Sequence, residues 1–184
     1  MRQPARVLLL CLLLALSTAA AAEAAPFTIE ARGSNTGLGR VLAIGDFKPD
    51  RDPTVGAATD AYGTPSSQRD FSNGSACRVV WSGIGVRVLF ANFGGGSACD
   101  PELGRVSTAR VYGGRWRTAR GLGVGHRLRR LKRLYPAAVR RGRNYRLITG
   151  RLIFGDNQPY GVLSARVSDG RVRSFKLAIY AAGD

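Results

Sequence analysis

Residues 116–136, WRTARGLGVGHRLRRLKRLYP, hold the densest group of side chains with chemical potential in this 184-residue chain. A glycine-rich motif at residues 121–125 precedes a segment in which leucines recur three residues apart and cations fill the positions between them. This spacing predicts a short amphipathic helix over residues 126–134, ended by Tyr135 and Pro136. Backbone N–H groups left exposed by the glycines at the start of that helix would form an anion site.

The cations of this stretch and of the segment after it predict an anion-binding surface. Guanidinium groups pair bidentately with phosphate or carboxylate groups, and residues 103–155 carry 15 basic and no acidic side chains. The alternative is a solvated helix face in a chain that contains 25 Arg and 3 Lys. Candidate partners are a wall polymer, anionic lipid headgroups, extracellular nucleic acid or an acidic protein. The predicted anion-binding residues are Arg127, Arg129, Arg130, Lys132, Arg133, Arg140, Arg141 and Arg143.

The sequence offers little for catalysis. His126 is the single histidine, and no carboxylate lies within about twenty residues of it in the sequence. Ser97 lacks the strand–turn–helix context that activates a nucleophile. Asp46, Asp50 and Asp52 do not have the spacing of a calcium loop. We therefore expect no catalytic residue, metal or cofactor, and a small exported hydrolase is only the third of three functional hypotheses.

The first 24 residues have the pattern of a signal peptide. Arg2 and Arg6 form a charged start, residues 7–16 are uniformly apolar, and Ala22-Glu23-Ala24 fits the cleavage rule. A retained membrane anchor is the alternative, but residues 7–22 are shorter than the roughly 20 apolar residues that a span needs. We predict an extracellular protein of bacterial origin with no transmembrane span after cleavage.

Two cysteines, Cys77 and Cys99, remain after removal of the signal peptide. In an exported chain, two cysteines without CxxC spacing predict a structural disulfide. Closing a loop of this length should stabilise the fold by about 3 kcal/mol on the chain-entropy model.

The pattern of elements predicts an α+β fold. Asp52 is expected to cap a helix that begins at Pro53 and ends near Gly63. Each half of the chain then has a short helix followed by antiparallel strands, which predicts two modules in tandem, at residues 25–113 and 114–184. The expected strands are residues 27–30, 40–44, 77–81, 86–90, 106–112, 145–149, 161–167 and 171–180.

Two sequence stretches carry a resemblance to known families. IGDFKPDRDPTVGAATDAYGTP and GLGVGHRLRRLKRLYP resemble the signature of the SmpA/OmlA and β-lactamase-inhibitory-protein-like modules. The chain also resembles secreted actinobacterial proteins of unknown function through C-x-V-x-W, W-R-T-x-x-G-L-x-V-G and L-x-x-L-Y-P. The first resemblance implies helical elements packed on an antiparallel sheet, and it implies a protein-inhibitor module as the alternative function. The hypothesis that follows from the residues is a secreted, non-enzymatic binding protein with a cationic surface.

Overall fold

The computed structural model of the protein describes residues 27–32, 41–151 and 159–178. The predicted signal peptide lies outside this described part of the chain. Within it, no helix has the length and apolar character needed to cross a membrane. Its elements are β1 (Phe27–Arg32), β2 (Val41–Ile44), α1 (Val55–Tyr62), β3 (Ser67–Phe71), β4 (Ala76–Trp81), β5 (Val86–Ala91), β6 (Arg105–Val111), β7 (Trp116–Thr118), α2 (Leu128–Leu134), β8 (Val139–Arg141), β9 (Asn144–Arg151), β10 (Pro159–Ser168) and β11 (Arg171–Ala178).

The predicted α+β class is wrong, because the protein is mostly β. The two helices of the described residues contain only eight and seven residues. The missing strands explain the error. All residues of β3 and β8 are exposed, so neither strand shows the alternation of apolar and polar residues by which a strand is recognised.

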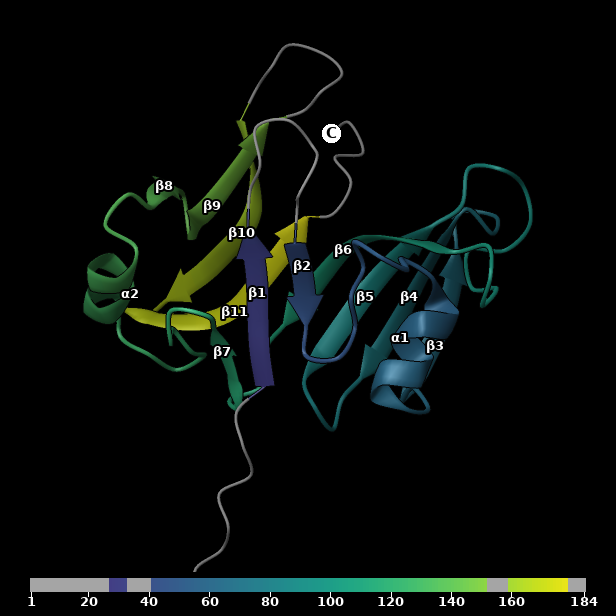
Figure 1. Cartoon of the computed structure of the whole chain (residues 1–184), viewed down its shortest axis with the longest axis horizontal. Coiled ribbons are helices and arrows are strands. Elements are labelled where there is room, and N and C mark those ends of the chain that lie inside the picture. Colours follow the sequence, from purple (N-terminus) through teal and green to yellow (C-terminus); the bar gives the residue numbers. More distant parts are fainter. Residues whose placement is uncertain (1–26, 33–40, 152–158, 179–184) are drawn as a thin grey trace, which may run out of the picture.

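An eight-stranded antiparallel sheet dominates the molecule (Figure 1). Its strand order is β3-β4-β5-β6-β11-β10-β9-β8. At its centre β6 pairs with β11, and Phe175 lies opposite Val111. The large sheet therefore takes strands from both sides of the module boundary predicted after residue 113, although the division itself stays a prediction.

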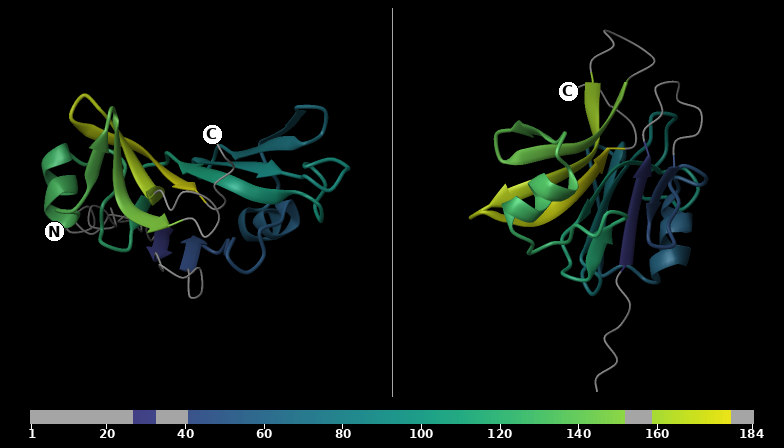
Figure 2. Two further views of the ribbon diagram at one scale, coloured as in Figure 1. Left: turned by 90° about the horizontal axis from the view of Figure 1, so that it is seen from above. Right: turned by 60° about the vertical axis from the view of Figure 1, so that its left-hand side comes forward.

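A second sheet has the order β2-β1-β7, with β1 and β7 parallel. This small sheet and α1 lie on the same side of the large sheet (Figure 2, left). Phe27 stacks on Trp116, with ring centroids 4.7 Å apart, and Trp116 is fully buried. The indole N–H of Trp116 donates to the carbonyl of Ile84 at 2.6 Å, which fastens the small sheet to the β4–β5 turn. One side of the large sheet is thus covered.

Helix α1 connects the two sheets. Tyr62 at its last turn donates to the carbonyl of Ile44 at 2.6 Å and packs edge-on against Trp81. The cap of α1 differs from the prediction, since Thr54 rather than Asp52 accepts from the N–H of Ala57, at 3.1 Å. Asp52 instead accepts from the backbone and the hydroxyl of Thr54, and these hydrogen bonds lower the pKa of Asp52. Helix α2 packs beside β11 and buries Leu131 completely.

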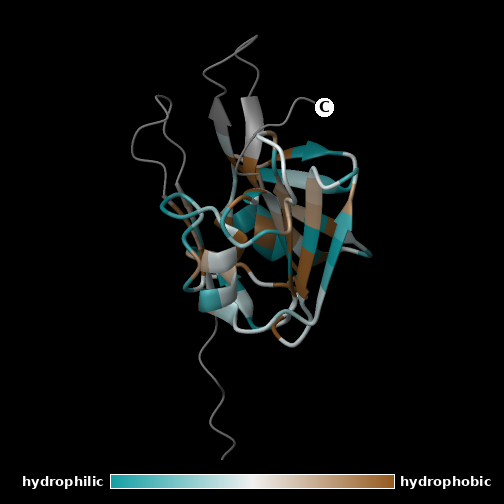
Figure 3. Ribbon diagram, turned by 90° about the vertical axis from the view of Figure 1, so that its right-hand side faces the viewer, coloured by the Kyte–Doolittle hydropathy of each residue, from teal (hydrophilic) through white to brown (hydrophobic). Residues whose placement is uncertain are grey.

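The inner strands alternate between apolar and polar residues, visible as alternating bands in Figure 3. In β5, Val86, Val88 and Phe90 are fully buried, whereas Arg87 between them is exposed. Alternate side chains of a strand point to opposite faces of a sheet. The apolar set therefore forms the core on the covered side, and the polar set forms the other face.

Candidate anion-binding site

One face of the large sheet is covered by no other described element, and it carries a row of cations that the strand register places side by side. Arg87 on β5 lies opposite Arg110 on β6, and Arg110 lies opposite Lys176 on β11. Residues opposite each other on neighbouring strands have Cβ atoms about 4.5–5.5 Å apart and share one face. Three cations from three strands are therefore direct neighbours.

The same register extends this cationic surface to both ends of the sheet. Arg69 on β3 lies opposite Arg78 on β4. Toward the other end, Asn144 on β9 lies opposite both Arg166 on β10 and Arg141 on β8. The cations of this surface, called the sheet face below, are Arg69, Arg78, Arg87, Arg110, Arg141, Arg146, Arg166, Arg173 and Lys176.

The sheet face holds no strand carboxylate to neutralise these cations. The eight strands contain one acidic residue, Asp70 on β3. Asp70 lies opposite the buried Cys77 and accepts from the hydroxyl of Ser97 at 2.7 Å, so it belongs to the covered side. Like charges directly opposite each other destabilise a sheet, and the fold keeps them here without compensation from the strands.

A cleft of about 360 Å³ lies at the centre of the sheet face. It is lined by Arg87, Arg110, Tyr112, Arg166, Ser168, Arg173 and Ser174. The four arginines come from β5, β6, β10 and β11, at the junction between the two halves of the sheet. The arginines are thus placed by backbone pairing across four strands.

The turn between β10 and β11 sets one edge of the cleft. Asp169 and Gly170 both have positive φ, 53° and 66°, as a tight hairpin turn requires. The carboxylate of Asp169 accepts from the guanidinium of Arg173 at 2.8 Å and from the hydroxyl of Ser168 at 3.1 Å. These hydrogen bonds lower the pKa of Asp169. Asp169 therefore pairs with one arginine of the cleft in this structure.

The cations predicted from the sequence are exposed, but the structure divides them among several places. Arg140 on β8 lies opposite the buried Tyr145, so it points to the covered side, whereas Arg141 belongs to the sheet face. Arg143 is close enough to Asp169 to help lower the pKa of that carboxyl. The other five, Arg127, Arg129, Arg130, Lys132 and Arg133, form the helix surface around α2.

The anion site predicted at the start of α2 is wrong, because its N–H groups already have partners. The N–H of Gly121 donates to Thr118, and that of Gly125 donates to Val172 on β11. The N–H of Gly123 donates to the Nδ1 atom of His126 at 3.0 Å. The N–H groups of the three glycines are therefore not free to bind an anion.

His126 has a structural role in this turn. Its Nδ1 atom must be unprotonated to accept from Gly123, and burial, with the charges of Arg130 and Arg117, lowers the pKa of His126. No group of three or more His, Cys, Asp or Glu side chains in the described part of the chain could hold a metal ion.

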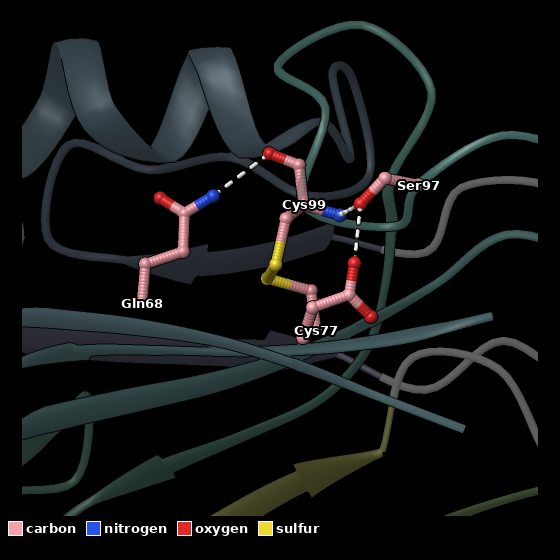
Figure 4. The surroundings of a disulfide bond; sticks show 5 residues. Gln68, Cys77, Ser97 and Cys99 are labelled. Atoms are coloured by element: carbon pink, nitrogen blue, oxygen red, sulfur yellow. Dashed lines mark hydrogen bonds between the residues drawn. A yellow bond between two sulfur atoms is a disulfide. The ribbon is translucent and has the colours of Figure 1, made fainter. Parts of the chain in front are cut away.

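The predicted disulfide between Cys77 and Cys99 is confirmed, with Cα atoms 5.0 Å apart. Figure 4 shows it beneath a polar network in which Gln68 donates to the carbonyl of Cys99 at 2.9 Å. The network and the disulfide fasten the loop between β5 and β6 to the edge of the sheet. That loop presents Phe93, whose side chain is 89% exposed.

Sequence reasoning missed the sheet face, although a signal for it was present. Strands β5, β6, β10 and β11 each place a cation at outward positions between buried residues, as with Lys176 between Phe175 and Leu177. That alternation shows which side of each single strand faces outward, but it does not show which strands lie next to one another. The pairing of β6 with β11, which brings the four sets together, joins segments more than sixty residues apart and has no local signature.

No protein-family model and no curated protein matches this chain. Among solved structures, the chain is similar to an extracellular protein containing an SCP domain from Bacillus anthracis str. Ames. The TM-score is 0.39 and the sequence identity 12%, over 68% of this chain and 42% of that chain. A similarity at this level identifies no family and carries no argument about the fold.

Proposed function

We propose that the protein is a secreted, non-enzymatic binding protein whose sheet face engages an anionic partner. The observation that carries this proposal is the composition of the sheet face, to which the strands contribute nine cations and no carboxylate. The proposal moves the predicted cationic surface from α2 to the sheet. It keeps Arg141 as a predicted site residue on the sheet face.

The electrostatic repulsion among the cations of the sheet face supports a binding role for this surface. Arg87, Arg110 and Lys176 repel one another across adjacent strands. An anionic partner would relieve that repulsion, and a concentrated positive field would accelerate its association. Because the backbones of the strands fix where the cations are attached, only their side chains would have to be ordered for binding.

Secretion is supported by two observations. The protein contains a disulfide. Disulfides form in oxidising compartments and are rare in cytosolic proteins. The first 24 residues also carry the pattern of a signal peptide.

Chromatography on heparin, a sulfated polymer, tests the proposal. We expect the wild-type protein to be retained and to elute at raised salt, and we expect the triple variant R87S/R110S/K176S to elute at clearly lower salt. Thermal unfolding of the variant serves as the control for folding, and these exposed substitutions should leave its midpoint unchanged or slightly higher. Elution of the folded variant at the wild-type salt concentration would exclude the sheet face as the binding surface.

A second candidate, a protein-inhibitor module, is favoured by Phe93. A large apolar side chain that is 89% exposed on a fastened loop is a suitable anchor for a pocket on a partner protein. This hypothesis predicts a 1:1 complex with a specific enzyme that survives high salt and is lost in Phe93→Ala. A pull-down from culture supernatant at high salt, with wild-type and variant protein in parallel, would distinguish it from polyanion binding.

A further inference from the structure

We infer that the central cleft of the sheet face is a pocket for a single tetrahedral oxyanion, a phosphate or sulfate group. The inference rests on the proposed function, in that it names the chemical group of the anionic partner that the sheet face would hold most closely. The cleft, of about 360 Å³ and open to solvent, has room for such a group together with part of the molecule that carries it.

A buried hydroxyl in the cleft points to a polar ligand. Ser174 lines the cleft and is only 7% exposed. In the described part of the chain, its side chain has no hydrogen-bond partner. Buried hydroxyl groups are nearly always hydrogen-bonded in proteins, and leaving one unpaired is costly. An oxyanion oxygen in the cleft would be an acceptor for this hydroxyl.

The guanidinium groups around Ser174 supply the charge. Ser174 on β11 lies opposite Arg166 on β10, and Arg87 and Arg110 line the cleft from β5 and β6. Arg87 also lies over the ring of Tyr112, with 6.0 Å between its guanidinium carbon and the ring centroid. Donors therefore reach the cleft from strands on both sides of β11.

The number and placement of these donors favour a tetrahedral group over a carboxylate. A carboxylate has two oxygens in one plane, and one guanidinium group can satisfy both. Four guanidinium groups on four strands exceed that need. A phosphate group offers three acceptor oxygens and a charge of about −1.5 to −2 when it is esterified, which matches donors that come from several directions.

The ion pair at the edge of the cleft does not block this role. The side chains of Arg173 and Asp169 are 50% and 76% exposed, and exposed ion pairs contribute little to stability. An incoming oxyanion can therefore share or take Arg173 at small cost. The other three arginines of the cleft have no carboxylate within ion-pairing distance in the described part of the chain.

Titration of the full-length secreted protein with inorganic phosphate, inorganic sulfate, glycerol 3-phosphate and acetate, followed by NMR or calorimetry, tests the inference. We expect saturable binding of the tetrahedral anions and none of acetate at the same concentration and ionic strength. Stronger binding of glycerol 3-phosphate than of free phosphate would identify a phosphate ester as the natural group, and a preference for sulfate would identify a sulfated one.

Single variants in the cleft and a control variant on the helix surface show whether the small anion binds in the cleft. Arg166→Gln should raise the Kd for the preferred anion at least tenfold, and Ser174→Ala should raise it about fivefold, whereas R129S/R133S on the helix surface should leave it unchanged. Ser174→Ala preserves the strand and guards against loss of folding as the explanation. Equal binding of acetate, or equal Kd values in all variants, would overturn the inference.

Heparin retention of the same variants distinguishes this inference from the proposed function. If retention on heparin stays dependent on the sheet face while no small oxyanion binds, the inference fails and the proposed function stands. If neither retention nor anion binding depends on the sheet face, both fail.

Discussion

The sheet face and the helix surface are both cationic, but they differ in how their charges are positioned. On the sheet face, backbone pairing across neighbouring strands places Arg87, Arg110 and Lys176 next to one another. On the helix surface, five cations follow one another along the chain around a helix of seven residues. Charge that is dense in the sequence is therefore spread over a helix, whereas charge that is dispersed in the sequence is gathered by the sheet.

The two surfaces also differ in what supports them. Strand β5, which carries Arg87, continues into a loop tied by the disulfide and by the hydrogen bond from Ser97 to Asp70. Helix α2 has no side-chain cap, since Arg127 at its N-cap makes no such hydrogen bond. Cations near the N-terminus of a helix also oppose its dipole. The helix surface thus lies on a weaker element.

The largest effect on stability is expected from the disulfide. The variant C77A/C99A should lose about 3 kcal/mol of unfolding free energy, because its unfolded chain is no longer constrained by the loop between these residues. Chemical denaturation of wild-type and variant protein measures the difference. A loss well below 1 kcal/mol would show that the polar network around Gln68 holds the loop without the covalent bond.

A smaller effect is expected from improving the cap of α2. Arg127→Asp supplies an N-cap acceptor and a favourable charge at the helix start, and it should stabilise the protein by about 1 kcal/mol. Chemical denaturation gives the change in stability, with Arg133→Asp near the other end of the helix as the matched control. The control should be neutral or destabilising. If Arg127→Asp lost heparin binding while Arg133→Asp kept it, the helix surface would take part in heparin binding, which contradicts the assignment of binding to the sheet face.

The smallest effect is expected from the titration of His126. Its pKa in the folded protein is lowered by burial and by neighbouring arginines, so the folded protein binds a proton less readily than the unfolded chain. The stability from neutral His126 is fully present above the unfolded pKa of about 6.5 and is lost as the pH falls through the folded value.

Denaturation midpoints measured between about pH 7.5 and pH 5 test this expectation. The wild-type midpoint should decrease over that window, and His126→Asn, which offers a neutral acceptor to the N–H of Gly123, should flatten the decrease. The same slope in both proteins would contradict the assignment of this window to His126. The pKa values of Asp52 and Asp169 are lowered, so the titration of these two carboxyl groups changes the stability of the protein only at more acidic pH.

The sequence was sufficient to predict the inner strands of the fold. Strands such as β5 and β11 carry buried residues at alternate positions, and the turn at Asp169 and Gly170 was recognisable as a hairpin. The edge strands β3 and β8 were not predicted, because strands exposed along their whole length have no apolar side to reveal them. Without β3 and β8, the size of the large sheet was underestimated, and the two helices led to the prediction of an α+β class.

The sheet face shares its residue type with the predicted anion-binding surface but not its location. An excess of arginine without carboxylates predicts a cationic surface, and its function stays a prediction. The cleft depends on pairing between β6 and β11, so Arg110 and Arg173 line the same cleft only because of this long-range pairing. That the buried hydroxyl of Ser174 has no hydrogen-bond partner among the described residues likewise follows only from the three-dimensional structure.

The dependence of polyanion affinity on salt tests the central claim most directly. Two variants that each remove three positive charges are compared with the wild type, R87S/R110S/K176S on the sheet face and R129S/R130S/R133S on the helix surface. Each lost contact with an anionic polymer should reduce the slope of log K against log salt by about 1. We predict a reduction of about 2 to 3 for the sheet-face variant and almost none for the helix-surface variant. Equal reductions in the two variants, or a larger one on the helix, would contradict the account.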